Sequence, residues 1–188
     1  MQERDARAKQ PVSALLAGPY GHPFHPILVT VPIGAWVSSL VLDLASLWTS
    51  DGAALATGAQ WLIGIGIVGA LAAATVGLLD FVLIPTGTPA HRTALVHMTL
   101  NVAVTVGFVV DLLWRLTGDD GGGTAVGPIV LSVVCLLALA VSGSLGGKLS
   151  YRYGVRVVTE AEQADGFTRA GAQPRDRQDH PSTGARGV

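Results

Sequence analysis

The chain has 188 residues, of which 49% are hydrophobic and only 13% are charged, whereas soluble domains carry about 25% charged residues. Its 12 basic and 13 acidic side chains leave no excess of positive charge, which argues against binding to the phosphate backbone of nucleic acid. A single cysteine, Cys135, excludes an internal disulfide and a Cys-ligated iron–sulfur cluster. These features place the chain in a membrane.

Four apolar stretches are long enough to cross a bilayer as helices. A hydrocarbon core about 30 Å thick needs about 20 apolar residues. The connections between the stretches are short and rich in Gly, Pro and Asp, so consecutive helices are expected to be antiparallel neighbours. We therefore predict an all-α fold, an integral membrane four-helix bundle with short loops, whose spans cover about 27–48, 61–84, 94–116 and 126–147.

Both ends of the chain are polar. Five charged side chains lie in residues 1–10 and nine in residues 159–188. The latter stretch holds one aromatic residue, Phe167, and cannot bury enough apolar surface to offset the entropy of ordering. We predict a polar N-terminal segment over 1–20, a transmembrane domain over 21–157 and a disordered C-terminal tail over 158–188.

The basic residues indicate an orientation. Four crossings place both termini on the same side as the connection between the second and third spans. The opposite side carries Arg115 alone, and short cytoplasmic segments are the ones enriched in Lys and Arg. We predict a bacterial inner (plasma) membrane protein with both termini in the cytoplasm, where the basic residues are Arg4, Arg7, Lys9, Arg92, Lys148, Arg152 and Arg156.

Four of the five histidines, namely His22, His25, His91 and His97, lie where the chain meets this cytoplasmic side. The first two precede prolines, which push a residue toward an extended conformation. Both are therefore expected to point the same way, just ahead of a helix that begins at Pro26. Pro32 is expected to bend this helix near its start.

The third span carries a polar stripe that should face the bundle interior. At 100° per residue, Asn101 and Asp111 each fall within about 40° of His97, and polar side chains in membrane helices seldom face lipid. Toward the opposite side, Asp43 and Asp111 are expected to meet each other or Arg115. At the cytoplasmic end, antiparallel threading predicts a cluster in which the ring nitrogens of His25 and His97 lie within about 10 Å, formed by His22, His25, Asp80, His91 and His97.

Several motifs follow one another along the chain. They are Gly21-His-Pro-Phe-His-Pro-Ile-Leu-Val, Pro32-Ile-Gly with Asp43, Gly77-Leu-Leu-Asp80, Ile84-Pro-Thr-Gly-Thr, His97 with Asn101, and Ser142-Gly-Ser-Leu-Gly-Gly-Lys-Leu-Ser-Tyr-Arg-Tyr-Gly-Val155. In this order they resemble the bacterial predicted-membrane-protein family known as domain of unknown function 2231, over roughly residues 20–157. Where the family usually has Tyr-Arg-His-Gly, this chain has Tyr151-Arg-Tyr-Gly154. Some relatives are joined to a Rieske iron–sulfur domain, so the resemblance implies electron transfer near the membrane.

The leading hypothesis is a redox-associated membrane protein that holds a haem b, a quinone or a transition-metal ion at its cytoplasmic end. Two imidazoles from facing helices suit a haem, and three histidines with a carboxylate suit zinc, copper or non-haem iron. His25 and His97 are the favoured ligands, with His22 and His91 as substitutes and Asp80 completing a metal set. The expected supporting or proton-carrying groups are Asn101, Asp43, Asp111 and Arg152. The expected partners are the lipid bilayer, a Rieske-type or other electron-transfer protein, and a second copy of the chain.

Two other classes of function stay open. A non-catalytic scaffold or accessory subunit uses the histidines only to hold helix ends. A small transporter or proton channel uses Asp43, Asp111 and His97 along one interior face, although a structural ion pair is the favoured role of the two aspartates. An absorption spectrum with metal analysis separates these classes from a redox site.

Overall fold

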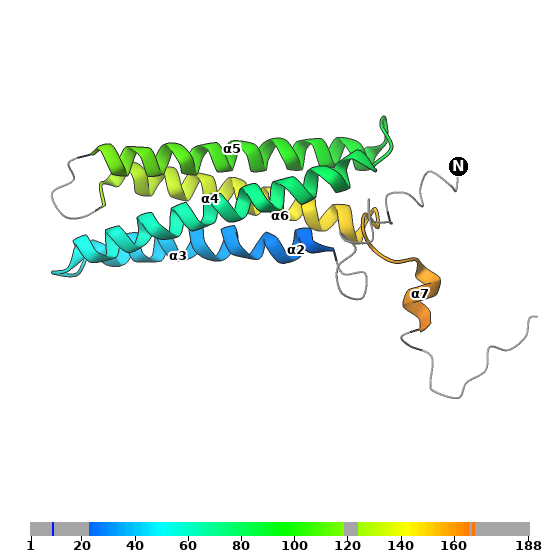
Figure 1. Cartoon of the computed structure of the whole chain (residues 1–188), viewed down its shortest axis with the longest axis horizontal. Coiled ribbons are helices and arrows are strands. Elements are labelled where there is room, and N and C mark those ends of the chain that lie inside the picture. The colour runs from blue at the N-terminus through cyan, green and yellow to red at the C-terminus, as the bar shows by residue number, and fades with distance from the viewer. Residues whose placement is uncertain (1–8, 10–22, 119–123, 166, 168–188) are drawn as a thin grey trace, which may run out of the picture. The chain divides into compact units, whose positions relative to one another are not determined.

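The structure is a computed structural model that describes residue 9 and residues 23–118, 124–165 and 167. It has two compact units, residues 1–157 and residues 158–188. The first unit is an all-α bundle of four long apolar crossings, each of sufficient length to span a bilayer (Figure 1). The predicted fold class is confirmed.

The crossings match the four predicted spans, but their helices are longer. The first crossing consists of α2 (Phe24–Leu28) and α3 (Thr30–Ser46). The others are α4 (Gly52–Val82), α5 (Pro89–Thr117) and α6 (Val126–Tyr151). The difference arises because hydropathy detects only the stretch that lies in hydrocarbon, whereas a helix continues beyond it while its backbone hydrogen bonds persist.

The first crossing begins earlier than predicted. α2 starts at Phe24 after Pro23, so His25 lies within the first turn of a helix and not in an extended segment ahead of Pro26. A helix can start there because Pro26 falls among its first residues, whose N–H groups have no partner within the helix. The expected interruption is present at Val29, where α2 gives way to α3 one turn before Pro32.

The four crossings pair as two helical hairpins. α3 packs along α4, and α5 packs along α6, while α4 contacts α5 and α3 contacts α6 (Figure 1). We call end A the end at which α2 begins, α4 is joined to α5 and α6 ends. End B is the opposite end, where α3 is joined to α4 and α5 to α6. Every candidate residue can be placed at one of these ends.

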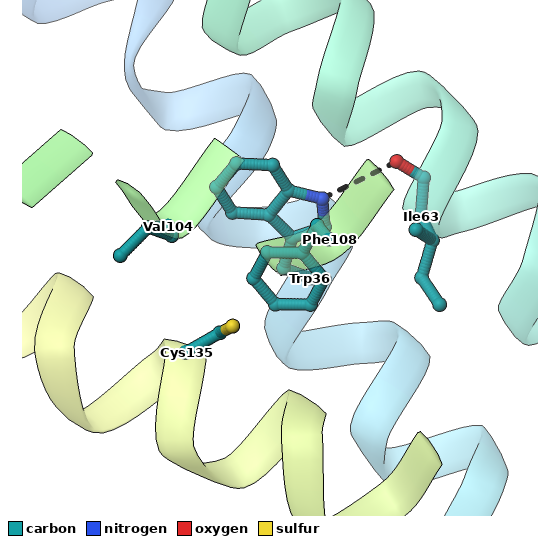
Figure 2. Packing of buried hydrophobic residues seen from close by; sticks show 5 residues of the cluster. All are labelled: Trp36, Ile63, Val104, Phe108 and Cys135. Carbon is teal, nitrogen blue, oxygen red and sulfur yellow. Dashed lines mark hydrogen bonds between the residues drawn. The ribbon is translucent and has the colours of Figure 1, made fainter. Parts of the chain in front are cut away.

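The middle of the bundle is held by a small apolar core to which all four crossings contribute (Figure 2). Trp36 of α3 stacks on Phe108 of α5 with ring centroids 4.1 Å apart, and its indole N–H donates to the carbonyl of Ile63 on α4. Val104 and Cys135 complete the cluster. The opposite faces carry exposed valine and leucine side chains, as expected of helices that contact lipid.

The second unit contains α7 (Glu160–Asp165), in the region predicted as a disordered tail. The sequence of these six residues, Glu-Ala-Glu-Gln-Ala-Asp, consists mainly of residues with high helix propensity. Disorder of the tail stays a prediction. The tail beyond residue 167 lies outside the described residues.

Candidate functional site: a histidine pair at end A

Two histidines from different hairpins face each other at end A. His25 lies on α2 and His97 on α5, with ring centroids 6.5 Å apart and ring planes at 80°. Both side chains are half-buried. The structure therefore brings together the two residues that were the favoured ligands, and His97 faces inward as its polar stripe predicted.

Each imidazole is held by a backbone carbonyl of the other helix in its own hairpin. Nδ1 of His25 lies 2.9 Å from the carbonyl oxygen of Ala73 on α4, and Nδ1 of His97 lies 2.8 Å from that of Ser142 on α6. Because a carbonyl only accepts hydrogen bonds, Nδ1 of each ring carries the hydrogen and Nε2 keeps its lone pair. This is the arrangement found for histidines that bind metals through Nε2.

Glycines provide the space that both rings occupy. A Cβ atom at Gly77 of α4 would lie 2.9 Å from Cε1 of His25, and one at Gly146 of α6 would lie 3.1 Å from Cε1 of His97. Both distances are shorter than an ordinary carbon–carbon contact. Any larger residue at these two positions would therefore displace the imidazole next to it.

The His97 ring has further polar neighbours. Asn101, one turn along α5, donates from Nδ2 to the His97 carbonyl at 2.8 Å and to the Ser142 hydroxyl at 2.7 Å. That hydroxyl also lies 3.0 Å from Nδ1 of His97. The stripe on α5 predicted Asn101 but not Ser142. A buried serine in an otherwise apolar span is the signal that could have identified it.

Asp80 and His91, which were expected to join the pair, have other partners. Asp80 forms an ion pair with Arg156, in which Oδ1 and Nε are 3.0 Å apart. The His91 ring packs against Phe81 with centroids 4.9 Å apart. His91 precedes His97 by six residues, which places it about 120° away around α5, so the two rings face different neighbours.

The four described members of the metal set predicted from the sequence do not form one cluster. Within residues 23–118 and 124–165, no three His, Cys, Asp or Glu side chains lie close enough together to hold a metal ion. His22 lies outside the described residues, and Arg152 is exposed just after α6. What the described residues offer is a site of two imidazoles.

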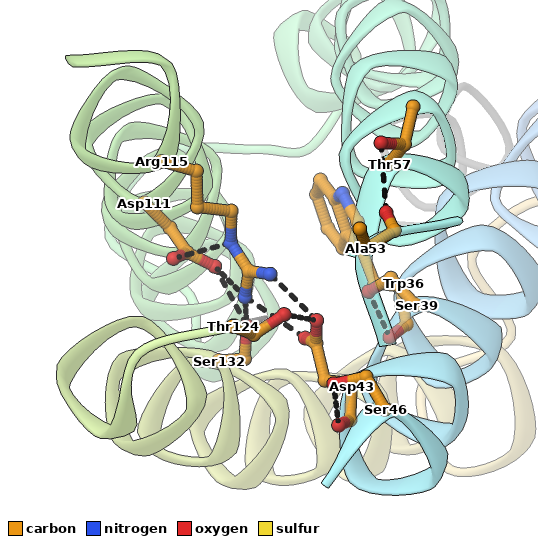
Figure 3. Close-up of polar contacts among 10 residues, drawn as sticks. All are labelled: Trp36, Ser39, Asp43, Ser46, Ala53, Thr57, Asp111, Arg115, Thr124 and Ser132. Atoms are coloured by element: carbon orange, nitrogen blue, oxygen red, sulfur yellow. Dashed lines mark hydrogen bonds and ion pairs between the residues drawn. The ribbon is translucent and has the colours of Figure 1, made fainter. Parts of the chain in front are cut away.

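A second polar cluster lies at end B, where Arg115 sits between two carboxylates (Figure 3). Its Nη1 and Nη2 donate to the two oxygens of Asp43 at 2.6 and 2.9 Å, and its Nε donates to Asp111 at 3.0 Å. Hydroxyls of Thr124 and Ser132 donate to Asp43 and Asp111, respectively. All three charged side chains are buried. The expected contact among them is present, whereas the two hydroxyl partners were not predicted.

The two polar clusters are separated by the apolar core. On α5, Val104 and Phe108 lie between the His97–Asn101 turn and Asp111, and both are at most 2% exposed. Trp36 covers Phe108 from α3. The polar stripe on α5 is therefore interrupted by apolar side chains rather than forming one continuous polar path between the ends.

Comparison with known proteins agrees with a membrane protein. A family model described as "Predicted membrane protein (DUF2231)" matches residues 21–159, which include the four crossings and the segment after α6. No curated protein matches the chain, and no solved structure does. The matched region contains the two histidines, the two glycines beside them and the whole end-B cluster.

Proposed function

The chain belongs to the predicted membrane protein family DUF2231, and on that premise we propose that it is a redox-associated membrane protein that binds one transition-metal centre between His25 and His97. The observation that carries this proposal is that Nδ1 of each ring is bonded to a backbone carbonyl, which leaves a lone pair on Nε2 of each ring to bind a metal. Nε2 of His97 also lies 3.3 Å from Nδ2 of Asn101, a contact that a metal would replace. Structural hydrogen bonding alone does not require two such rings to face each other.

The separation of the rings supports one shared centre. Metal–nitrogen bonds are about 2.0 Å long, so two imidazoles that bind one atom from opposite sides have ring centroids about 6 Å apart, close to the 6.5 Å between His25 and His97. Copper and zinc ions take imidazole ligands, and a haem iron takes two axial ones. A quinone fits less well, because its carbonyl oxygens accept hydrogen bonds and both Nε2 atoms are acceptors too.

The spectrum of the purified protein tests the proposal. We expect the full chain, extracted in detergent, to contain about one metal atom per chain by elemental analysis, with an intense visible band if that metal is haem iron. His25→Ala and His97→Ala should each abolish this loading. His91→Ala is the matched control, since its ring packs on Phe81 at the same end, and it should leave the loading unchanged. A protein that takes up no metal would disprove the proposal.

A non-catalytic membrane subunit is the second candidate. It is favoured by the fact that the described residues offer only two metal ligands, and that both histidine–carbonyl bonds also tie one helix to another. In that case His25→Ala lowers the stability of the bundle, and no metal or haem accompanies the wild-type protein. A transporter is less well supported, because Val104 and Phe108 interrupt the polar stripe on α5.

We further propose that end A faces the cytoplasm of a bacterial cell and that any electron-transfer partner, such as a Rieske-type protein, docks there. Two observations support this orientation. Arg92, Lys148 and Arg152 are exposed at end A, whereas Arg115, the basic residue at end B, is buried between two aspartates.

A further inference from the structure

The chain does not leave the bundle directly after α6. Residues 152–157 turn back across end A, and we call them the cap segment. The N–H of Val155 donates to the carbonyl of Leu149 at 3.0 Å, and that of Tyr153 donates to the carbonyl of Lys148 at 3.2 Å. Val155 is buried in a cluster with Ile84, Ala94 and Leu149. The side chain of Val155 thus anchors the segment to α5, to α6 and to Ile84, which follows the end of α4.

The contacts of the cap segment lie one helical turn beyond the histidine pair. At a rise of 1.5 Å per residue, three residues along a helix correspond to about 4.5 Å. On three helices, the residue that the cap segment contacts lies three residues closer to end A than a residue of the imidazole layer. The pairs are Asp80 and Gly77 on α4, Ala94 and His97 on α5, and Leu149 and Gly146 on α6. The cap segment therefore covers the layer that contains the imidazoles.

An ion pair holds the cap segment down. Arg156, whose side chain is 8% exposed, reaches Asp80 of α4, whose side chain is 17% exposed. The backbone of Arg156 has φ +58°, a left-handed conformation that a residue with a side chain adopts only when its surroundings enforce it. Gly154, two residues earlier, has φ +67° without such strain. The left-handed backbone of Arg156 and the half-buried ion pair together indicate that contacts with the bundle hold the segment in this conformation.

We infer that the cap segment closes end A over His25 and His97, and that the Arg156–Asp80 ion pair is its lock. Breaking this pair removes the contact between the segment and α4, and the segment then exposes the two imidazoles to the aqueous side of end A. The inference concerns access to the two imidazoles. It rests on the proposed function only for the reason why such access matters, because the contacts of the cap segment are the same with or without a metal. It assigns Arg156 and Asp80 as residues that control entry, with no direct contact to a ligand.

The test measures how fast diethyl pyrocarbonate, which modifies unprotonated imidazoles, reacts at His25 and His97. The full chain is treated in detergent with a chelator present, and modified peptides are quantified by mass spectrometry. We expect slow modification in the wild type and several-fold faster modification in Arg156→Gln and Asp80→Asn. In Arg156→Gly, glycine adopts the left-handed backbone without strain but the charge is lost. His25 and His97 should therefore be modified as fast as in Arg156→Gln, because the ion pair is what holds the segment.

Two variants serve as controls. Arg152→Gln removes an exposed arginine of the same segment and should leave the rate unchanged. Arg156→Lys keeps the charge and should restore most of the protection, which separates loss of the lock from loss of the fold. Equal rates in wild type and Arg156→Gln, with helical circular dichroism retained, would overturn the cap. Because no metal is present, this result is independent of whether the protein binds one.

Discussion

Gly77 on α4 leaves the space that the imidazole of His25 occupies, because a Cβ atom there would lie 2.9 Å from Cε1 and 3.0 Å from Nδ1. The absence of a side chain at one position thus determines where a side chain on another helix can lie. This relationship is directly testable.

We expect Gly77→Ala to displace His25 from the Ala73 carbonyl and to lower the free energy of unfolding by about 1–3 kcal/mol, the usual cost of overpacking. Metal loading should fall with it. Gly34→Ala on α3 is the matched control, since a Cβ atom there has no neighbour within 4 Å. Thermal unfolding in detergent measures both variants, and equal melting temperatures for the two would contradict the assignment.

Replacing Arg115 by Ala should be far more damaging than any other change at end B. It leaves Asp43 and Asp111 as two buried carboxylates without a cation, which costs about 3–5 kcal/mol. Arg92→Ala, at an exposed position of the same helix, should cost little. The measurement is the yield of folded, monodisperse protein together with its melting temperature. Similar values for both variants would show that the end-B cluster contributes nothing to stability.

The Ser142 hydroxyl should matter for His97 although it is not a ligand. Ser142→Ala removes one of the two acceptors of the Asn101 amide, so we expect the free energy of unfolding to fall by about 1–3 kcal/mol and the spectrum of any metal bound at His97 to shift. Ser144→Ala is a suitable control because that exposed hydroxyl bonds only to the carbonyl of Val141 in its own helix. An unchanged spectrum in Ser142→Ala would mean that His97 is oriented by its backbone contact alone.

Reporter fusions test the proposed orientation. Fusions after Asp51 and after Gly122, at end B, should report a periplasmic location, and fusions after Pro89 and Ala172 a cytoplasmic one. The reverse pattern would place the histidine pair and the cap segment on the periplasmic side. It would leave the geometry of the site unaltered.

The sequence was sufficient to predict the four crossings and the inward-facing pair of His25 and His97. Both predictions depend on the cost of placing polar groups in lipid. Hydropathy identifies spans, and the cost of exposing His97 and Asn101 to lipid determines which face of α5 turns inward. The partners of the rings could not be predicted in the same way. The carbonyls of Ala73 and Ser142 carry no sequence signal, because every residue has one.

The errors at end A have a common cause. His91 and Asp80 were assigned to the cluster mainly by their depth in the membrane, but the direction of a side chain around its helix decides its neighbours. His91 packs on Phe81, and Asp80 is bound by Arg156, which lies beyond the fourth predicted span. The turn that brings Arg156 back depends on two left-handed residues, of which the sequence signals only Gly154.

His25 is anchored within the first hairpin, by Ala73, and His97 within the second, by Ser142. Each half of the bundle can therefore orient its own imidazole before the halves meet, and the complete site exists only after they dock. A ligand that binds both rings therefore cross-links the two hairpins. Its binding energy then adds to the stability of the assembled bundle by mass action, so the loaded protein should resist separation of its halves more strongly than the empty one.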